Sequence, residues 1–314
     1  MNMENEEDAE IEKIMGDSIM NLLLDKMIKK QRLEFDNLTT KRMKTMSFPD
    51  DVTEIKSIPY LLDNIPAHRL DVYRPTSTKC ALPVIVNVHG GGLLMGSKEF
   101  NRFYCAQLCK LGFVVFSIEY RLIPEVTVFE QFADVSNAMN FIERSVTLYG
   151  GDPTHIYMVG DSAGAYLITY TTALQRSRLL ADATLVRPST LHIRAIGLIS
   201  GMFYTNRFDK IGMFLPKMLY GSNYKNSTFS QFINPEHSEI VENLPPCYLI
   251  TSHADELHNY TTDFADALKK VGASFVLNDC PPDKRLVHAF SVFEPTMDKS
   301  VEVTKEMVEY LLQH

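Results

Sequence analysis

The sequence predicts an α/β fold in which helices cover both faces of a mostly parallel central sheet. After Pro49, short β-rich runs alternate with stretches of helical spacing, which is the pattern of a sheet with crossover helices. Several of these runs are apolar almost throughout, as strands covered on both faces require. The 314 residues, 45% of them apolar, are enough to bury a full-sized core.

The expected elements follow one another along the chain. The strands are residues 83–88, 113–120, 156–159, 193–200, 247–252 and 275–277. The helices are residues 101–110, 129–147, 163–176, 260–271 and 297–312.

Two segments stand outside this alternation. Residues 1–48 carry apolar side chains at helical spacing, which predicts an amphipathic helix docked on the domain and a second segment around residues 33–38. Those side chains are Ile11, Ile14, Met15, Ile19, Leu22, Leu23 and Met27. Residues 202–235 are rich in aromatic and long apolar side chains and show no clear strand. They are interpreted as an insertion between two strands, either a lid or a loop and helix that complete the core.

Composition argues against several kinds of partner and site. The net charge of −8 disfavours nucleic acid, because phosphate backbones are bound mainly through clustered Lys and Arg. Nothing approaches the roughly 20 apolar residues of a membrane span. The five cysteines include no CxxC pair, which favours neither a disulfide framework nor a zinc site. The first ten residues are acidic and no export signal is visible, so a cytoplasmic protein is expected.

Ser162 is the candidate nucleophile. It stands in Gly160-Asp161-Ser162-Ala163-Gly164, between an expected strand and an expected helix. A serine on so sharp a turn is crowded, so glycine is needed two residues before it and two after it. The pattern alone is moderate evidence, because three fixed positions recur by chance in roughly one chain in ten of this length.

A second motif, His89-Gly90-Gly91-Gly92, directly follows the strand at 83–88. Consecutive glycines let backbone N–H groups approach a bound carbonyl, and acyl transfer needs such donors for its oxyanion. The N–H of Ala163, at the start of a helix, is a further expected donor. A phosphate loop is disfavoured because no Gly-Lys-Ser/Thr sequence follows.

A serine nucleophile needs a base and an acid that orients it. After a nucleophile elbow, the chain order is serine, acid, histidine. Asp255 follows the strand at 247–252 and His288 follows the strand at 275–277, so these two residues are favoured. The less favoured bases are His253 and His258, and the less favoured acids are Glu256 and Asp283.

With these residues placed, the sequence from Asp71 to His314 resembles the hormone-sensitive-lipase-like family of α/β hydrolases. Beyond the two glycine motifs, the resemblance rests on six short segments. They are Asp71–Pro75, Tyr120–Glu125 (YRLIPE), Tyr149–Pro153 (YGGDP), Leu244–Pro246, Asp255–Leu257 and His288–Phe290. His253 departs from the pattern, because the family usually has glycine there; its ring is expected to point to solvent.

The resemblance implies an α/β-hydrolase fold, with a catalytic domain over residues 49–314 and a helical cap built from residues 1–48 and about 202–235. It implies a catalytic triad of Ser162, Asp255 and His288, and oxyanion donors at Gly91, Gly92 and Ala163. It further implies hydrolysis of small-molecule, short-chain acyl esters without a cofactor or metal. Arg121 and Glu125 are expected to be structural, and a homodimer is an option because family members commonly form dimers.

Other functions stay open on the same residues. A deacetylase of acetylated sugars or xenobiotics, or an amide hydrolase, would use the same triad on a different leaving group. A non-catalytic ligand receptor is less favoured, because it requires a broken triad and all three members are present.

Overall fold

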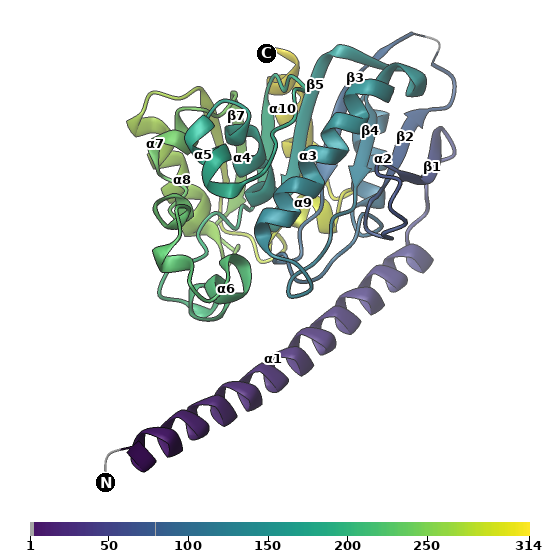
Figure 1. Cartoon of the computed structure of the whole chain (residues 1–314). Coiled ribbons are helices and arrows are strands. Elements are labelled where there is room, and N and C mark those ends of the chain that lie inside the picture. The colour runs from purple at the N-terminus through teal and green to yellow at the C-terminus, as the bar shows by residue number, and fades with distance from the viewer. Residues whose placement is uncertain (1–2, 79) are drawn as a thin grey trace.

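The computed structural model describes residues 3–78 and 80–314, apart from the side chains of residues 3–23, 210, 213 and 214. Eight strands of this part of the chain form one sheet in the order β1-β2-β4-β3-β5-β6-β7-β8 (Figure 1). They are β1 (Val52–Pro59), β2 (Arg69–Pro75), β3 (Leu82–Val88), β4 (Val114–Ile118), β5 (Gly151–Asp161), β6 (Ile196–Ile199), β7 (Cys247–Ser252) and β8 (Phe275–Cys280). Pairing is parallel from β4 through β8, which confirms the predicted mostly parallel sheet.

Helices cover both faces of the sheet, as the apolar strands require. One face packs against α2 (Arg102–Lys110), α9 (Phe290–Phe293) and α10 (Asp298–Leu312). The other face packs against α3 (Val128–Ser145), α4 (Ala163–Leu174) and α8 (His258–Lys270). Each face therefore has its own apolar core, with the sheet between the two. Among the described residues, no helix combines the length and the apolar run that crossing a bilayer would require.

Two strands precede the first one that the sequence predicts. β1 and β2 form an antiparallel extension of the sheet, and β2 joins it by pairing with β4. β1 is an edge strand with several exposed side chains and an irregular register between Ile55 and Ile58. Its sequence consequently lacks the continuous apolar run that marks the strands of the centre.

The N-terminal segment is a single helix, α1 (Met3–Thr45), so the expectation of a separate segment at 33–38 was wrong. No Gly or Pro interrupts residues 17–45, and nothing in that stretch ends the helix. The predicted apolar face depends mainly on residues 11–23, whose side chains lie outside the described ones. Further along, Ile28 is buried and the ring of Phe35 lies 4.5 Å from that of Phe100. α1 thus docks on the domain through its later turns, while its start lies far from the sheet (Figure 1).

The segment between β6 and β7 is helical, with α6 (Lys210–Tyr220), two short 3₁₀ helices (Tyr224–Asn226 and Ser230–Ile233) and α7 (Ser238–Val241). α5 (Arg178–Thr184) lies earlier, between α4 and β6, and was not predicted. Tyr220 of α6 exchanges a 2.8 Å hydrogen bond with Tyr166 of α4, so α6 is tied to the helix that follows Ser162. The assignment of residues 1–48 and 202–235 to a cap stays a prediction.

Candidate active site

The predicted site residues gather at the carboxyl ends of the parallel strands, where open α/β sheets bind their ligands. His89 follows β3, Ser162 follows β5, Asp255 follows β7 and His288 follows β8. Neighbouring parallel strands end at the same edge, so residues separated by up to about 200 positions in sequence share one edge of the sheet.

Ser162 occupies a strained turn between β5 and α4. Its backbone angles are φ 50° and ψ −113°, an arrangement that costs about 1–3 kcal/mol and persists only where the surroundings impose it. Its N–H donates to the carbonyl of Ile199 at 2.8 Å. A Cβ on Gly164 would lie 2.0 Å from the carbonyl oxygen of Val88, so only glycine lets α4 start this close to β3. The turn is therefore built as the glycine pattern predicts.

His288 and Asp255 are joined directly. His288 Nδ1 lies 2.8 Å from Asp255 Oδ1, which also accepts from the N–H of Leu257 at 2.8 Å. Burial disfavours the charged form of both groups, but their mutual hydrogen bond and attraction outweigh it: the pKa of His288 is raised and that of Asp255 is lowered. With Nδ1 held by the carboxylate, Nε2 is the nitrogen that remains for proton transfer.

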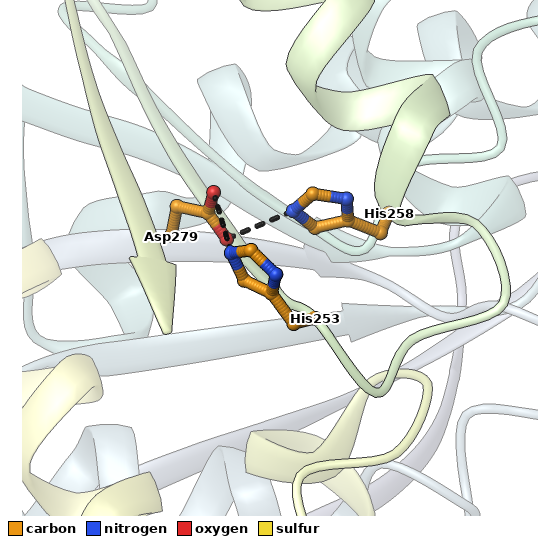
Figure 2. Close-up of side chains that lie close together, drawn as sticks. All are labelled: His253, His258 and Asp279. Carbon is orange, nitrogen blue, oxygen red and sulfur yellow. Dashed lines mark hydrogen bonds and ion pairs between the residues drawn. The ribbon is translucent and has the colours of Figure 1, made fainter. Parts of the chain in front are cut away.

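The rival residues are engaged elsewhere. Asp283 pairs with Arg285 at 2.7 Å, and Glu256 is exposed. The rings of His253 and His258 contact the carboxylate of Asp279 (Figure 2). Among the described residues, these three form a group whose ligand atoms lie close enough together to hold a metal ion.

The glycine-rich loop follows β3 and therefore lies at the same edge of the sheet. Gly91 has φ +116°, and a Cβ there would lie 2.0 Å from the carbonyl oxygen of Met95. The carbonyl of Gly91 accepts from the N–H groups of Leu94 and Met95, which closes the loop into a turn. Within the described part of the chain, the N–H groups of Gly91, Gly92 and Ala163 have no hydrogen-bond acceptor. Their role as donors to a bound oxygen stays a prediction.

Asp161 connects this loop to the serine turn. Its buried carboxylate accepts from the N–H of Gly90 at 3.2 Å and from Asn101 Nδ2 at 2.8 Å. Burial raises the pKa of this carboxyl. These contacts hold the glycine-rich loop against the serine turn.

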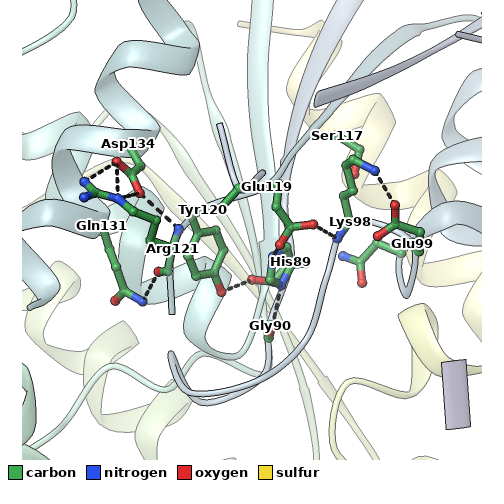
Figure 3. Close-up of polar contacts among 12 residues, drawn as sticks. His89, Gly90, Lys98, Glu99, Ser117, Glu119, Tyr120, Arg121, Gln131 and Asp134 are labelled. Carbon is green, nitrogen blue, oxygen red and sulfur yellow. Dashed lines mark hydrogen bonds and ion pairs between the residues drawn. The ribbon is translucent and has the colours of Figure 1, made fainter. Parts of the chain in front are cut away.

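A buried network under the loop was not predicted (Figure 3). His89 places Nε2 3.1 Å from Glu119 and Nδ1 2.7 Å from the carbonyl of Gly90. Its ring stacks on Tyr120, with centroids 4.3 Å apart, and the Tyr120 hydroxyl donates to the His89 carbonyl. Burial alone would lower the pKa of His89, but Glu119 raises it above the ordinary value. Both ring nitrogens face acceptors, so the doubly protonated ring fits this position and fixes the start of the loop.

Arg121 and Glu125, expected to be structural, each form an ion pair. Arg121 forms an ion pair with the buried Asp134 at 2.7 Å, and Glu125 forms one with Arg32 of α1 at 2.7 Å.

Two arginines of α1 donate hydrogen bonds to backbone carbonyls near the site, and neither contact was predicted. Arg32 donates to the carbonyl of Leu94 at 2.6 Å, just after the glycine run. Arg42 donates to the carbonyls of Val292 and Phe293, just after His288, and lies 4.6 Å from the ring centroid of Phe100. α1 thus connects the glycine-rich loop to α9, the short helix that follows His288, through contacts that span 62 and 250 residues.

Replacing Arg42 by alanine is expected to lower both the free energy of unfolding and kcat. The change leaves two carbonyls of α9, the short helix that follows His288, without their charged donor, which costs about 2–3 kcal/mol. Chemical denaturation measures the stability, and hydrolysis of p-nitrophenyl butyrate measures kcat.

Arg102→Ala is the matched control for Arg42. Arg102 pairs with Glu54 at 2.7 Å, lies 3.9 Å from the ring centroid of Phe48 and contacts Met43 of α1, but it has no hydrogen bond to α9 among the described residues. It should destabilise the chain comparably and leave kcat unchanged. Equal losses of kcat in the two variants would show that α1 acts on stability alone.

Comparison with known proteins identifies the family of the fold. A family model described as alpha/beta hydrolase fold matches residues 85–291. A protein named probable isoprenylcysteine alpha-carbonyl methylesterase, from Arabidopsis thaliana, is 29% identical over 223 residues, covering 66% of this chain and 46% of that protein. The chain spans about half the length of the plant methylesterases that it matches. Carboxylesterase NlhH of Mycobacterium tuberculosis is 25% identical over 241 residues, 74% of each chain.

A solved structure shows the same architecture over nearly the whole chain. Esterase B from Lactobacillus Rhamnosis superposes with a TM-score of 0.87 at 21% identity, covering 94% of this chain and 95% of that one. The predicted fold and the predicted resemblance are confirmed. The chain belongs to the α/β-hydrolase fold family, and it resembles the hormone-sensitive-lipase-like members of that family.

Proposed function

We propose that this chain hydrolyses carboxylic esters with short acyl chains, with Ser162 as nucleophile, His288 as general base and Asp255 as the acid that orients it. The observation that carries the proposal is the 2.8 Å contact between His288 Nδ1 and Asp255 Oδ1, at the same sheet edge as the strained Ser162. The similarity to carboxylesterases supports the choice of ester bonds.

The residues divide the reaction into two steps. His288 Nε2 takes the proton of Ser162 Oγ as this oxygen attacks the ester carbonyl. The resulting oxyanion accepts hydrogen bonds from the N–H groups of Gly91, Gly92 and Ala163, each typically worth about 2.7–4 kcal/mol of the barrier. His288 then returns the proton to the departing alcohol, leaving Ser162 acylated. Water attacks the acyl group with His288 again as base, and the acid is released.

A series of p-nitrophenyl acetate, butyrate and octanoate tests the proposal. We expect kcat/KM to be highest for the two short esters and at least about tenfold lower for octanoate. Peptide mapping after treatment with a p-nitrophenyl phosphonate should place one adduct on Ser162. Hydrolysis no faster than that of a Ser162→Ala preparation, or an adduct on another residue, would refute it. Matching acetanilides in the same series separate an amide hydrolase from an esterase.

A methyl ester of a larger acid is a second candidate substrate. The similarity to plant proteins named as isoprenylcysteine methylesterases favours it, over 66% of this chain. In such an ester the alcohol is small and the acid is large, the reverse of a short acyl ester. Release of methanol from the methyl ester of a prenylated cysteine, at a kcat/KM above that for p-nitrophenyl acetate, would favour this substrate class.

A further inference from the structure

Two histidines and an aspartate form a cluster outside the proposed hydrolytic residues, and Figure 2 shows their side chains close together. His253 follows β7, His258 begins α8, and Asp279 lies near the end of β8, the strand that pairs with β7. His253 Nε2 lies 3.5 Å from Asp279 Oδ2, and His258 Nε2 lies 3.0 Å from Asp279 Oδ1. One carboxylate thus faces an imidazole nitrogen from each of two other elements.

These separations are close to those within a metal coordination shell. A tetrahedral Zn²⁺ with bonds of about 2.0–2.1 Å holds its ligand atoms about 3.3 Å apart. The three candidate ligand atoms lie within 4.8 Å of one another, and the two imidazole rings are 4.6 Å apart between centroids. The three atoms are therefore already close to the spacing that one ion requires.

The chemistry of the donors selects the metal. Two imidazole nitrogens and one carboxylate suit Zn²⁺, whereas Ca²⁺ and Mg²⁺ take mostly oxygen ligands. The side chains of His253, His258 and Asp279 are 48%, 20% and 30% exposed. The cluster is therefore open to ions from solution, and its outer side leaves the fourth coordination position to water.

We propose that His253, His258 and Asp279 form a binding site for Zn²⁺, completed by solvent. The site is separate from the hydrolytic residues, but backbone hydrogen bonds connect it to the turn that carries Asp255. The N–H of His258 donates to the carbonyl of Asp255 at 3.1 Å, and the N–H of His253 donates to the carbonyl of Cys280 at 3.1 Å. A bound ion ties the Asp255 turn to β8 and resists separation of the two strands. His253 is thus a metal ligand, rather than a side chain that only points to solvent.

Isothermal titration of ZnCl₂ into the untagged full chain tests the site. We expect one ion per chain, and a Kd at least about tenfold higher in His253→Gly and in His258→Ala. X-ray absorption should give a first shell of nitrogen and oxygen at about 2.0–2.1 Å, with two imidazoles. The melting temperature should differ between zinc and EDTA in the parent chain. It should be the same in both conditions in the double variant that combines His253→Gly with His258→Ala.

His155→Ala is the matched control, because His155 contacts Asp152 at 2.8 Å and forms a histidine–aspartate pair without the second ring. It should bind Zn²⁺ as the parent does. Circular dichroism in EDTA confirms that each variant is folded before zinc is added. A double variant that binds Zn²⁺ with the parent's Kd, or a first shell containing sulfur, would overturn the proposal. Absence of binding by the folded parent would show that the cluster is held by hydrogen bonds alone.

Discussion

Replacing His288 by alanine is expected to lower kcat for ester hydrolysis by a factor on the order of 10⁶, and Ser162→Ala should do the same. Without His288 Nε2, no group is placed to take the proton of Ser162 Oγ, and a neutral serine hydroxyl is a weak nucleophile. The two residues act as one unit, so the double variant should be no slower than either single variant. Single-turnover hydrolysis of p-nitrophenyl acetate measures all three rates.

His192→Ala is the control for these variants, because His192 is exposed and lies away from the site edge. It should retain the parent's kcat. Thermal melts show whether each variant remains folded. A folded His288→Ala chain with kcat within about tenfold of the parent would exclude His288 as the base and reopen the choice between His253 and His258.

The fold was predictable where burial leaves a continuous signal in the sequence. The strands from β3 to β7 are apolar runs because helices cover both of their faces. β1 has exposed side chains on an edge, and no sequence window there carries more than a weak alternation. We predicted two segments where the structure has the single helix α1. The apolar spacing weakens after Leu23, although the backbone stays helical to Thr45.

The site was predictable where chemistry demands particular residue types in a fixed order. Ser162, Asp255 and His288 were chosen by motif and chain order, and the structure brings the last two within hydrogen-bonding distance. Their catalytic roles stay a prediction. The contacts of Arg32 and Arg42 were not predictable. In the sequence both residues look like ordinary surface arginines of a helix, and their partners lie 62 and 250 residues away. His253 was expected to face only solvent, because its contact with Asp279 depends on the pairing of β7 and β8.

Replacing Asp255 by asparagine is expected to lower kcat by about 10⁴-fold while keeping the shape of the site. Asp255 Oδ1 accepts the proton on His288 Nδ1. An asparagine that turns its NH₂ toward Nδ1 makes this nitrogen the acceptor, so the ring proton moves to Nε2. Nε2 then cannot take the proton of Ser162. Asp255→Glu keeps the acceptor and should recover part of the rate, whereas a purely structural role predicts similar rates in both variants.

The pH dependence gives this substitution a second readout. Attraction to Asp255 holds the pKa of His288 above the value of about 6.5 that is ordinary for histidine. The parent should therefore lose kcat/KM as the pH falls through that raised pKa, because the protonated ring cannot act as a base. In Asp255→Asn the hydrogen bond to a carboxylate and its charge are gone while burial, which lowers the pKa, remains. The acid limb of the profile should move to lower pH even as the rate falls. A limb that stays in place would mean that Asp255 does not set the protonation of His288, and the acid would then have to be sought elsewhere on the same edge.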